Sequence, residues 1–263
     1  MQTRRSALLS LAAVPVLLGL LGLSTTQDGA TAPAESRLKG KTVVITGANR
    51  GLGLEFARQY VAAGANVIGT ARKPKEATEL AATGARVLQL DVADEASVDA
   101  FAEAVGDAPV ALLVNNAGVS GRSWAGEVGY AELTRRVMDV NTLGPMRVTE
   151  ALLPNLTATK GGAVVNVSSR LGSIASNTVG KYSGYRESKA ALNMYSRSLA
   201  FDHADEGLLA ICVSPGWVKT DMGGPDADLT PEESITGLRS VIETLDEKQS
   251  GLFLNHDGTV LEW

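Results

Sequence analysis

The sequence contains very little cysteine and histidine and few aromatic residues. Its 263 residues include one cysteine, two histidines and 5% aromatic residues. A lone Cys212 excludes a disulfide within the chain, and its place in the apolar run 208–213 predicts a buried strand thiol. His203 and His256 lie far apart without neighbouring ligands, so we expect no metal site.

An excess of positive charge is also missing. The formal net charge is -5, the sequence pI is near 5.2, and no basic patch stands out. These features argue against nucleic-acid binding. The chain has no internal repeat and no low-complexity tract, which argues against a repeat architecture. The 44% of hydrophobic residues can build a sizeable core.

The first 37 residues differ from the rest. A short basic head, residues 1–6, precedes the apolar run 7–23, in which Ser10 is the polar exception. This order is typical of a signal sequence, and Thr3-Arg4-Arg5 resembles a twin-arginine export signal. The apolar run is close to the lower limit of a membrane-spanning helix, so an uncleaved anchor stays open.

A linker of small residues, 24–36, follows and contains a possible cleavage site, Ala32-Pro33-Ala34. We therefore divide the chain into a leader with its linker, residues 1–37, and a single globular domain, residues 38–263. The leader predicts an exported or membrane-anchored protein that contacts the membrane only through this segment. A leader that does not function would leave the protein in the cytoplasm.

The domain begins with an apolar strand and a glycine-rich turn. Residues 42–45 are apolar and β-branched, glycines follow at once, and apolar residues then recur at helical spacing up to Val61. Such a strand, turn and helix direct backbone N–H groups and the positive helix end at a pyrophosphate. A helix-capping turn in any α/β protein could show the same pattern. The predicted cofactor residues here are Gly47, Asn49, Arg50, Gly51, Leu52 and Gly53.

The second strand, residues 66–70, indicates which dinucleotide binds. It ends in Ala71-Arg72, where an acidic residue would bind the ribose 2′-hydroxyl of NAD. An arginine there favours a 2′-phosphate instead, and Arg50 is a second cation within reach of the same group. We therefore predict NADP, with NAD less favoured. Both arginines could also be ordinary solvated side chains.

Two more predicted strands end in polar residues. Residues 86–90 precede Asp91-Val92, and residues 111–114 precede Asn115-Asn116-Ala117-Gly118. The carboxyl ends of parallel strands bind ligands in open α/β sheets. Asp91 could accept from an adenine amino group, and Asn116 could bond to backbone across the strands. Either residue could equally be a helix cap or a turn residue.

A tyrosine and a lysine on one predicted helix indicate proton chemistry. The strand 162–167 ends in Ser168-Ser169, and the helix 182–203 carries Tyr185 and Lys189 on one face. A nearby ammonium and an oxidised nicotinamide would lower the phenol pKa from about 10, so that Tyr185 could exchange a proton near neutral pH. Ser169 could hydrogen-bond the reacting oxygen. Such a pair alone is usually a surface contact.

Seven motifs together resemble the short-chain dehydrogenase/reductase family, in its C-factor-like and small carbonyl-reductase branch. They are TGANRGLG at 46–53, Asp91-Val92, NNAG at 115–118, Asn141, Ser169, YRESK at 185–189 and SPGWVKT at 214–220. The resemblance implies Ser169, Tyr185 and Lys189 as catalytic residues, with Asn141 holding a relay water and Lys189 bonding the nicotinamide ribose. It also implies a homodimer or homotetramer. The implied cofactor residues are Asp91, Val92, Asn116, Ala117, Gly118, Tyr185, Lys189, Pro215, Gly216, Val218 and Thr220.

The sequence departs from the family pattern in one segment. The gap between Ser169 and Tyr185 is longer than usual, and Tyr182 stands at the shorter distance. Four residues after Tyr182 comes Arg186 instead of lysine, so we choose Tyr185. Residues 173–183 are then an insert, interpreted as a longer loop on the substrate side. Ser168 is a possible substitute for Ser169, which fits the S-x-x-G pattern better.

We therefore expect a doubly wound, mostly parallel, seven-stranded Rossmann-type α/β sheet in one domain. The expected function is hydride transfer between NADP(H) and a small carbonyl compound or secondary alcohol, with Tyr185 as general acid/base. The alternative is a non-catalytic dinucleotide-binding signalling or sensor protein. Residues 217–231, rich in glycine, proline and aspartate, predict a mobile lid over the nicotinamide.

Overall fold

The computed structural model describes residues 35–158 and 160–263, so the predicted signal or anchor segment lies outside the described residues. The folded unit runs from Glu35 to Trp263. Residues 35–37, which the sequence assigned to the leader and its linker, belong to this unit. The Ser36 hydroxyl donates to Glu243 over 2.6 Å, and the Arg37 guanidinium donates to the carbonyl of Ile242 over 2.8 Å.

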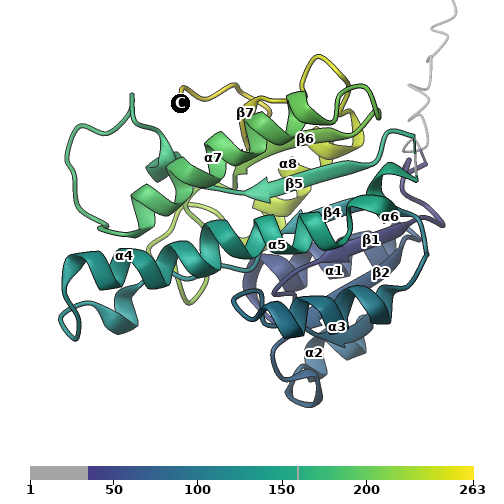
Figure 1. The fold of residues 1–263 in the computed structure, drawn as a ribbon, viewed down its shortest axis with the longest axis horizontal. Helices are drawn as coiled ribbons and strands as arrows, with labels where there is room; N and C mark the ends of the chain where they lie inside the picture. Colours follow the sequence, from purple (N-terminus) through teal and green to yellow (C-terminus); the bar gives the residue numbers. More distant parts are fainter. Residues whose placement is uncertain (1–34, 159) are drawn as a thin grey trace, which may run out of the picture. The chain divides into compact units, whose positions relative to one another are not determined.

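Within the described residues, seven strands form one sheet in the order β3-β2-β1-β4-β5-β6-β7 (Figure 1). Every neighbouring pair is parallel, which confirms the predicted Rossmann-type sheet and makes it wholly parallel. The strands are β1 Thr42–Ile45, β2 Asn66–Ala71, β3 Arg86–Gln89, β4 Val110–Asn115, β5 Ala163–Val167, β6 Leu209–Ser214 and β7 Phe253–Asn255.

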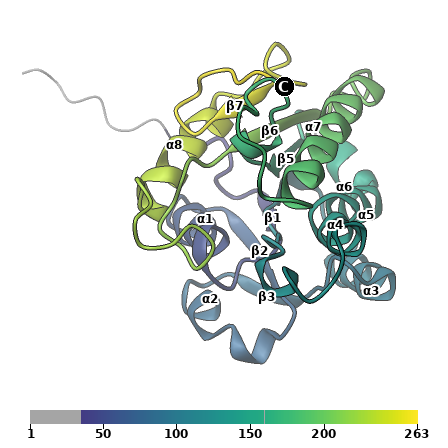
Figure 2. The same cartoon turned by 90° about the vertical axis from the view of Figure 1, so that its left-hand side faces the viewer.

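Helices cover both faces of the sheet. Figure 2 shows α1 and α8 on one side of the strands and α3, α5 and α7 on the other. The helices are α1 Gly51–Ala62, α2 Thr78–Ala82, α3 Glu95–Val105, α4 Tyr130–Met138, α5 Gly144–Ala151, α6 Leu153–Thr157, α7 Tyr185–Asp202 and α8 Pro231–Glu243. Short turns are η1 Pro74–Glu76, η2 Arg122–Trp124, the π-helical η3 Asp139–Leu143 and η4 Arg170–Gly172.

The core consists of two apolar layers, because successive strand residues face opposite sides of the sheet. Val43 and Ile45 of β1 pack in the layer that contains Phe56 of α1, whereas Val44 packs in the layer that contains Phe101 of α3. All five side chains are at most 1% exposed. Burying one such side chain contributes about 1.5–3 kcal/mol, so both helix layers are held firmly on the sheet.

The chain order of the strands reverses between β1 and β4, which are direct neighbours in the sheet. Connections from these two strands run to opposite faces, and the crevice between them is where open α/β sheets bind ligands. The turn after β1 and the loop after β4 therefore meet at the carboxyl edge. The ends of β5 and β6 reach the same edge because all the strands are parallel.

Gly53, in the first turn of α1, provides a test of how tightly this crevice is packed. A Cβ there would overlap the Gly47 carbonyl and lie 2.5 Å from Asn116 Nδ2. We expect Gly53→Ala to lower the free energy of unfolding by about 1–3 kcal/mol, although alanine favours helix. The control is Gly129→Ala, because nothing lies within 4 Å of a Cβ at Gly129. Urea unfolding with equal effects for both variants would contradict the packing argument.

Candidate active site

The glycine-rich turn after β1 is fixed to the loop after β4 by side-chain hydrogen bonds. Thr46 Oγ1 accepts from the backbone N–H groups of Asn116 and Ala117, each over 3.0 Å. Asn116 Nδ2 donates back to the carbonyls of Thr46 and Gly47, over 2.9 and 3.0 Å. This confirms that Asn116 bonds backbone across the strands. Its amide therefore shapes the turn.

The turn has the features that a pyrophosphate group needs. Gly47 has φ of 61°, and a Cβ there would lie 3.0 Å from Ala117 Cα, so only glycine fits without strain. Gly51, the first residue of α1, also has positive φ, at 54°. Among the described residues, no side chain caps α1 and no acidic residue lies in its first turn. Its positive end thus suits an anion, and the residues present fit the predicted dinucleotide.

The two predicted 2′-phosphate cations are exposed. Arg72 directly follows the last residue of β2 and makes no ion pair with residues 35–158 or 160–263. Arg50 precedes α1, and its Nη1 lies 2.9 Å from Asp221 Oδ2. Asn49 beside it is exposed and Leu52 is half-buried against the core. The structure thus brings both arginines to the carboxyl edge of the sheet. One of them, Arg50, is paired there with the carboxylate of Asp221.

Asp91 and Val92, after β3, have local roles. Asp91 Oδ1 accepts from the N–H of Ala93 over 3.1 Å, which is the turn-forming use of aspartate that the sequence left open. Val92 is buried, and a Cβ on Gly144 would lie 2.7 Å from its Cγ2. Val92 therefore packs against the start of α5. Gly118, at the end of the NNAG segment, lies close to Asn141 and Lys189.

The segment after β6 passes close to the glycine turn. A Cβ on Gly51 would lie 3.5 Å from Thr220 Cγ2. Pro215 accepts from the Ser234 hydroxyl of α8 over 2.7 Å, and Gly216 has φ of 81° against His256. The predicted lid, residues 217–231, contains one isolated bridge, Val218–Leu229, and otherwise follows an irregular path up to Pro231, where α8 begins. Its mobility stays a prediction.

Tyr185 and Lys189 occupy the first turns of α7, as expected. Lys189 is 4% exposed, its Nζ donates to the carbonyl of Val167 over 2.8 Å, and it lies 5.8 Å from the centre of the Tyr185 ring. The helix begins at Tyr185, three residues later than predicted. Lys181 and Tyr182 have φ of 61° and 57°, and this left-handed backbone cannot be part of an α-helix.

The structure distinguishes the two candidate serines by their contacts. The Ser168 hydroxyl is buried and donates to Asn193 Oδ1 over 2.6 Å. Ser169 is half-buried, and its side chain stands near enough to Tyr185 to lower the pKa of the phenol. Its hydroxyl also accepts from the N–H of Leu171, which starts η4. Ser169 is therefore the serine that stands beside the predicted acid/base.

The two candidate tyrosines also differ. Tyr182 is 51% exposed, and the guanidinium of Arg186 lies 5.9 Å from its ring centre. Tyr185 is half-buried between Ser169 and Lys189. The insert, residues 173–183, forms neither helix nor strand, in agreement with its interpretation as a loop.

Asn141 lies in the π-helical turn η3, at 0% exposure. Its Oδ1 accepts from the N–H of Val119 over 2.8 Å, and its Nδ2 donates to the Val119 carbonyl and to Ser188 Oγ over 2.9 and 3.1 Å. Ser188 precedes Lys189 on α7. Asn141 thus connects the loop after β4 with the helix that carries the lysine, and π-turns are frequent at functional sites.

Burial sets the protonation of the tyrosine and the lysine. It raises the pKa of Tyr185, while the nearby Ser169 side chain acts in the opposite direction. Burial also lowers the pKa of Lys189 from 10.5 to about 8. From the sequence we expect the lysine and an oxidised nicotinamide to lower the phenol pKa. The protein groups alone favour the protonated phenol, because removal from water disfavours the phenolate.

The described residues contain no group of three or more histidine, cysteine, aspartate or glutamate side chains placed to hold a metal ion. In the same part of the chain, no helix combines the length and the apolar character that crossing a membrane requires. Cys212 is 0% exposed in β6, which confirms the predicted buried strand thiol.

Several residues of the site were not predicted from the sequence. Thr46 and Asn193 hold turns through side-chain hydrogen bonds, and Ser188 is a partner of Asn141. Thr46 stands directly at the end of a strand, which is a weak signal. Asp221 pairs with Arg50 across 171 positions of the chain, and no local pattern signals such a pair.

Comparison with known proteins identifies the family. A family model described as short chain dehydrogenase matches residues 41–229. C-signal of Myxococcus xanthus is 48% identical over 165 residues, which cover 62% of this chain and 99% of that protein. The 1-hydroxy-2-glutathionyl-2-methyl-3-butene dehydrogenase of Rhodococcus sp. (strain AD45) is 36% identical and covers 84% of this chain and 99% of its own length.

Among solved structures, the NADPH-bound carbonyl reductase from chicken fatty liver is 35% identical, with a TM-score of 0.79. The match covers 86% of this chain and 100% of the reductase. The chain belongs to the short-chain dehydrogenase family, as the sequence motifs predicted. It is an NAD(P)-dependent oxidoreductase.

The buried lysine predicts an unusual stability change. A pKa lowered from 10.5 to about 8 corresponds to roughly 3 kcal/mol of folding free energy lost at neutral pH, where Lys189 is charged in both states. The wild type regains this energy as pH rises from about 8 to 10.5, because only the folded state has then lost the proton. We therefore expect Lys189→Met to raise Tm by several degrees at pH 7 without cofactor. Calorimetry should show a smaller difference at pH 9.5, and a pH-independent difference would contradict the argument.

Proposed function

We propose that the protein is an NADP-dependent carbonyl reductase in which Tyr185 is the general acid. One observation carries the proposal. Tyr185, with Ser169 and Lys189 beside it, lies at the same edge of the sheet as the glycine-rich turn before α1, a helix whose N-terminus has no side-chain cap. A site that only bound a dinucleotide would have no need for a phenol held between a hydroxyl and an ammonium group.

NADPH, when bound, supplies a hydride to the carbonyl carbon. Tyr185 donates its phenolic proton to the carbonyl oxygen, and Ser169 donates a hydrogen bond to the same oxygen. Burial raises the pKa of Tyr185, so the phenol is protonated near neutral pH, as a general acid must be. Lys189 uses one of its three N–H donors on Val167, and the others can bind ribose hydroxyls. Asn141 stays the predicted holder of the relay water.

NADP is favoured over NAD by charge at the end of β2. Arg72 occupies the position after this strand, and Arg50 stands at the start of α1. Guanidinium groups bind phosphate well because their fork of donors matches its oxygens. The NADPH bound to the chicken reductase supports the same cofactor here. The substrate is a small carbonyl compound.

A non-catalytic signalling or sensor protein is the second candidate, and the likeness to C-signal is the observation that favours it. The presence of Asn141, Ser169, Tyr185 and Lys189 together favours the enzyme, because signalling alone requires none of their proton chemistry. Export or membrane anchoring through the leader, and assembly into a homodimer or homotetramer, stay predictions.

Replacing the phenol tests the enzyme directly. We expect Tyr185→Phe to lower kcat by on the order of 10²- to 10⁴-fold, because the proton donor is lost, while the variant still binds NADPH. Turnover is followed at 340 nm with NADPH and a panel of aldehydes, ketones and quinones. Tyr182→Phe is the matched control and should keep full activity. If wild type and Tyr185→Phe bind NADPH but are equally inert, the signalling candidate replaces the enzyme.

Charge reversal at Arg72 tests the choice of cofactor. We expect Arg72→Asp to weaken NADPH binding more than about tenfold while NADH binding changes by less than about twofold, because only NADPH carries the 2′-phosphate. Lys41→Asp makes the same change of charge before β1, at the opposite edge of the sheet, and should affect neither cofactor. Titration of nucleotide fluorescence measures both affinities. Equal losses for NADPH and NADH would remove Arg72 from the phosphate site.

A further inference from the structure

The lid is attached to both sides of the crevice by arginine side chains. Arg50 at the glycine turn pairs with Asp221, with 2.9 Å between Nη1 and Oδ2. Arg122 of η2, on the other side, donates to the carbonyl of Met222 over 3.1 Å. Within the lid, Trp217 Nε1 donates to the Gly223 carbonyl over 2.9 Å. Residues 221 and 222 therefore lie between the cofactor turn and the loop after β4.

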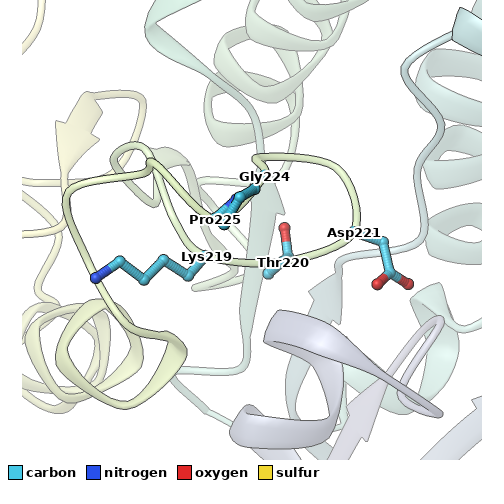
Figure 3. A pocket seen from close by; sticks show the side chains of 5 residues that line it. All are labelled: Lys219, Thr220, Asp221, Gly224 and Pro225. Carbon is cyan, nitrogen blue, oxygen red and sulfur yellow. The ribbon is translucent and has the colours of Figure 1, made fainter.

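The Asp221 carboxylate points toward the glycine turn. Figure 3 shows the side chains of Lys219 and Asp221 extending to opposite sides of a shallow hollow, with Thr220 between them. Thr220 is the lid residue that approaches Gly51. Asp221 therefore places a negative charge at the rim of the site that we assign to the phosphates of the cofactor.

The pair between Arg50 and Asp221 is a weak contact. The Arg50 and Asp221 side chains are largely exposed to solvent, at 71% and 80%. Solvent-exposed ion pairs contribute little to stability. A phosphate dianion carries more charge than a carboxylate and offers the guanidinium more acceptor oxygens. It can therefore displace the carboxylate, although the cost of breaking the pair reduces the affinity.

We infer that Asp221 competes with the 2′-phosphate of NADP(H) for Arg50 and thereby weakens binding of the phosphorylated cofactor. This inference rests on the proposed function. NAD(H) lacks the 2′-phosphate and leaves the pair intact. Asp221 is thus a positioning residue that acts through Arg50, and it moderates the preference for NADP(H) that the two arginines produce.

The test compares two aspartates of the lid. Asp221→Asn should tighten NADPH binding about two- to fivefold, with little change for NADH, because Arg50 no longer has a competing partner. Asp226→Asn removes the same charge from the same loop at a residue that forms no ion pair with Arg50 in the described part of the chain, and it should leave the ratio of the two affinities unchanged. Asp221→Glu should restore the wild-type value. In an Arg50→Gln background, Asp221→Asn should have no effect on NADPH.

Three results would overturn the inference. Equal gains from Asp221→Asn and Asp226→Asn would indicate a general charge effect. A gain that persists with Arg50→Gln would exclude the arginine as the intermediary, and an equal gain for NADH would exclude the 2′-phosphate. Thermal unfolding checks that every variant is folded. Wild-type protein that neither binds nor oxidises NADPH would contradict the proposed function as well, whereas normal turnover without these differences would contradict the inference alone.

Discussion

The contact between the turn after β1 and the loop after β4 is the constraint on which the site depends. The Asn116 amide donates to two carbonyls of the turn, and Thr46 accepts two N–H groups of the loop. With its carbonyls bound in this way, the turn is held in one shape before a ligand arrives, which saves the entropy of ordering it. Gly47 and Gly53 are required because the backbones approach too closely for a side chain.

Helix α7 imposes the second constraint, because it places a cation where water is excluded. Leu192 and Leu199 are at most 6% exposed and hold the helix on the sheet. The same packing buries Lys189, whose charge is then stabilised mainly by the Val167 carbonyl. Burial of a charge lowers the free energy of unfolding. The fold is therefore less stable at the position where proton chemistry requires a lysine.

The sequence predicted six of the seven strands because each contains consecutive apolar residues between turn-forming segments, and strand ends locate ligand sites in a parallel sheet. The seventh, Phe253–Asn255, is too short to produce a pattern. The start of α7 was placed too early because Lys181 and Tyr182 adopt positive φ without glycine. The pair between Arg50 and Asp221 depends on the path of the 171 positions between them, and no short sequence motif predicts it.

The charged residues of the site fall into a buried group and a solvent-exposed group. Lys189 is enclosed, so dissolved salt hardly screens its interaction with Tyr185, and its geometry follows from the packing of α7. Arg50 and Arg72 stand in solvent, where charges are screened over about 8 Å at physiological ionic strength. Proton chemistry therefore depends on the core, whereas the choice of cofactor depends on exposed side chains. Substitutions of Arg50 or Arg72 can therefore alter cofactor preference with little effect on the catalytic geometry, because changes to exposed side chains usually disturb the folded core little.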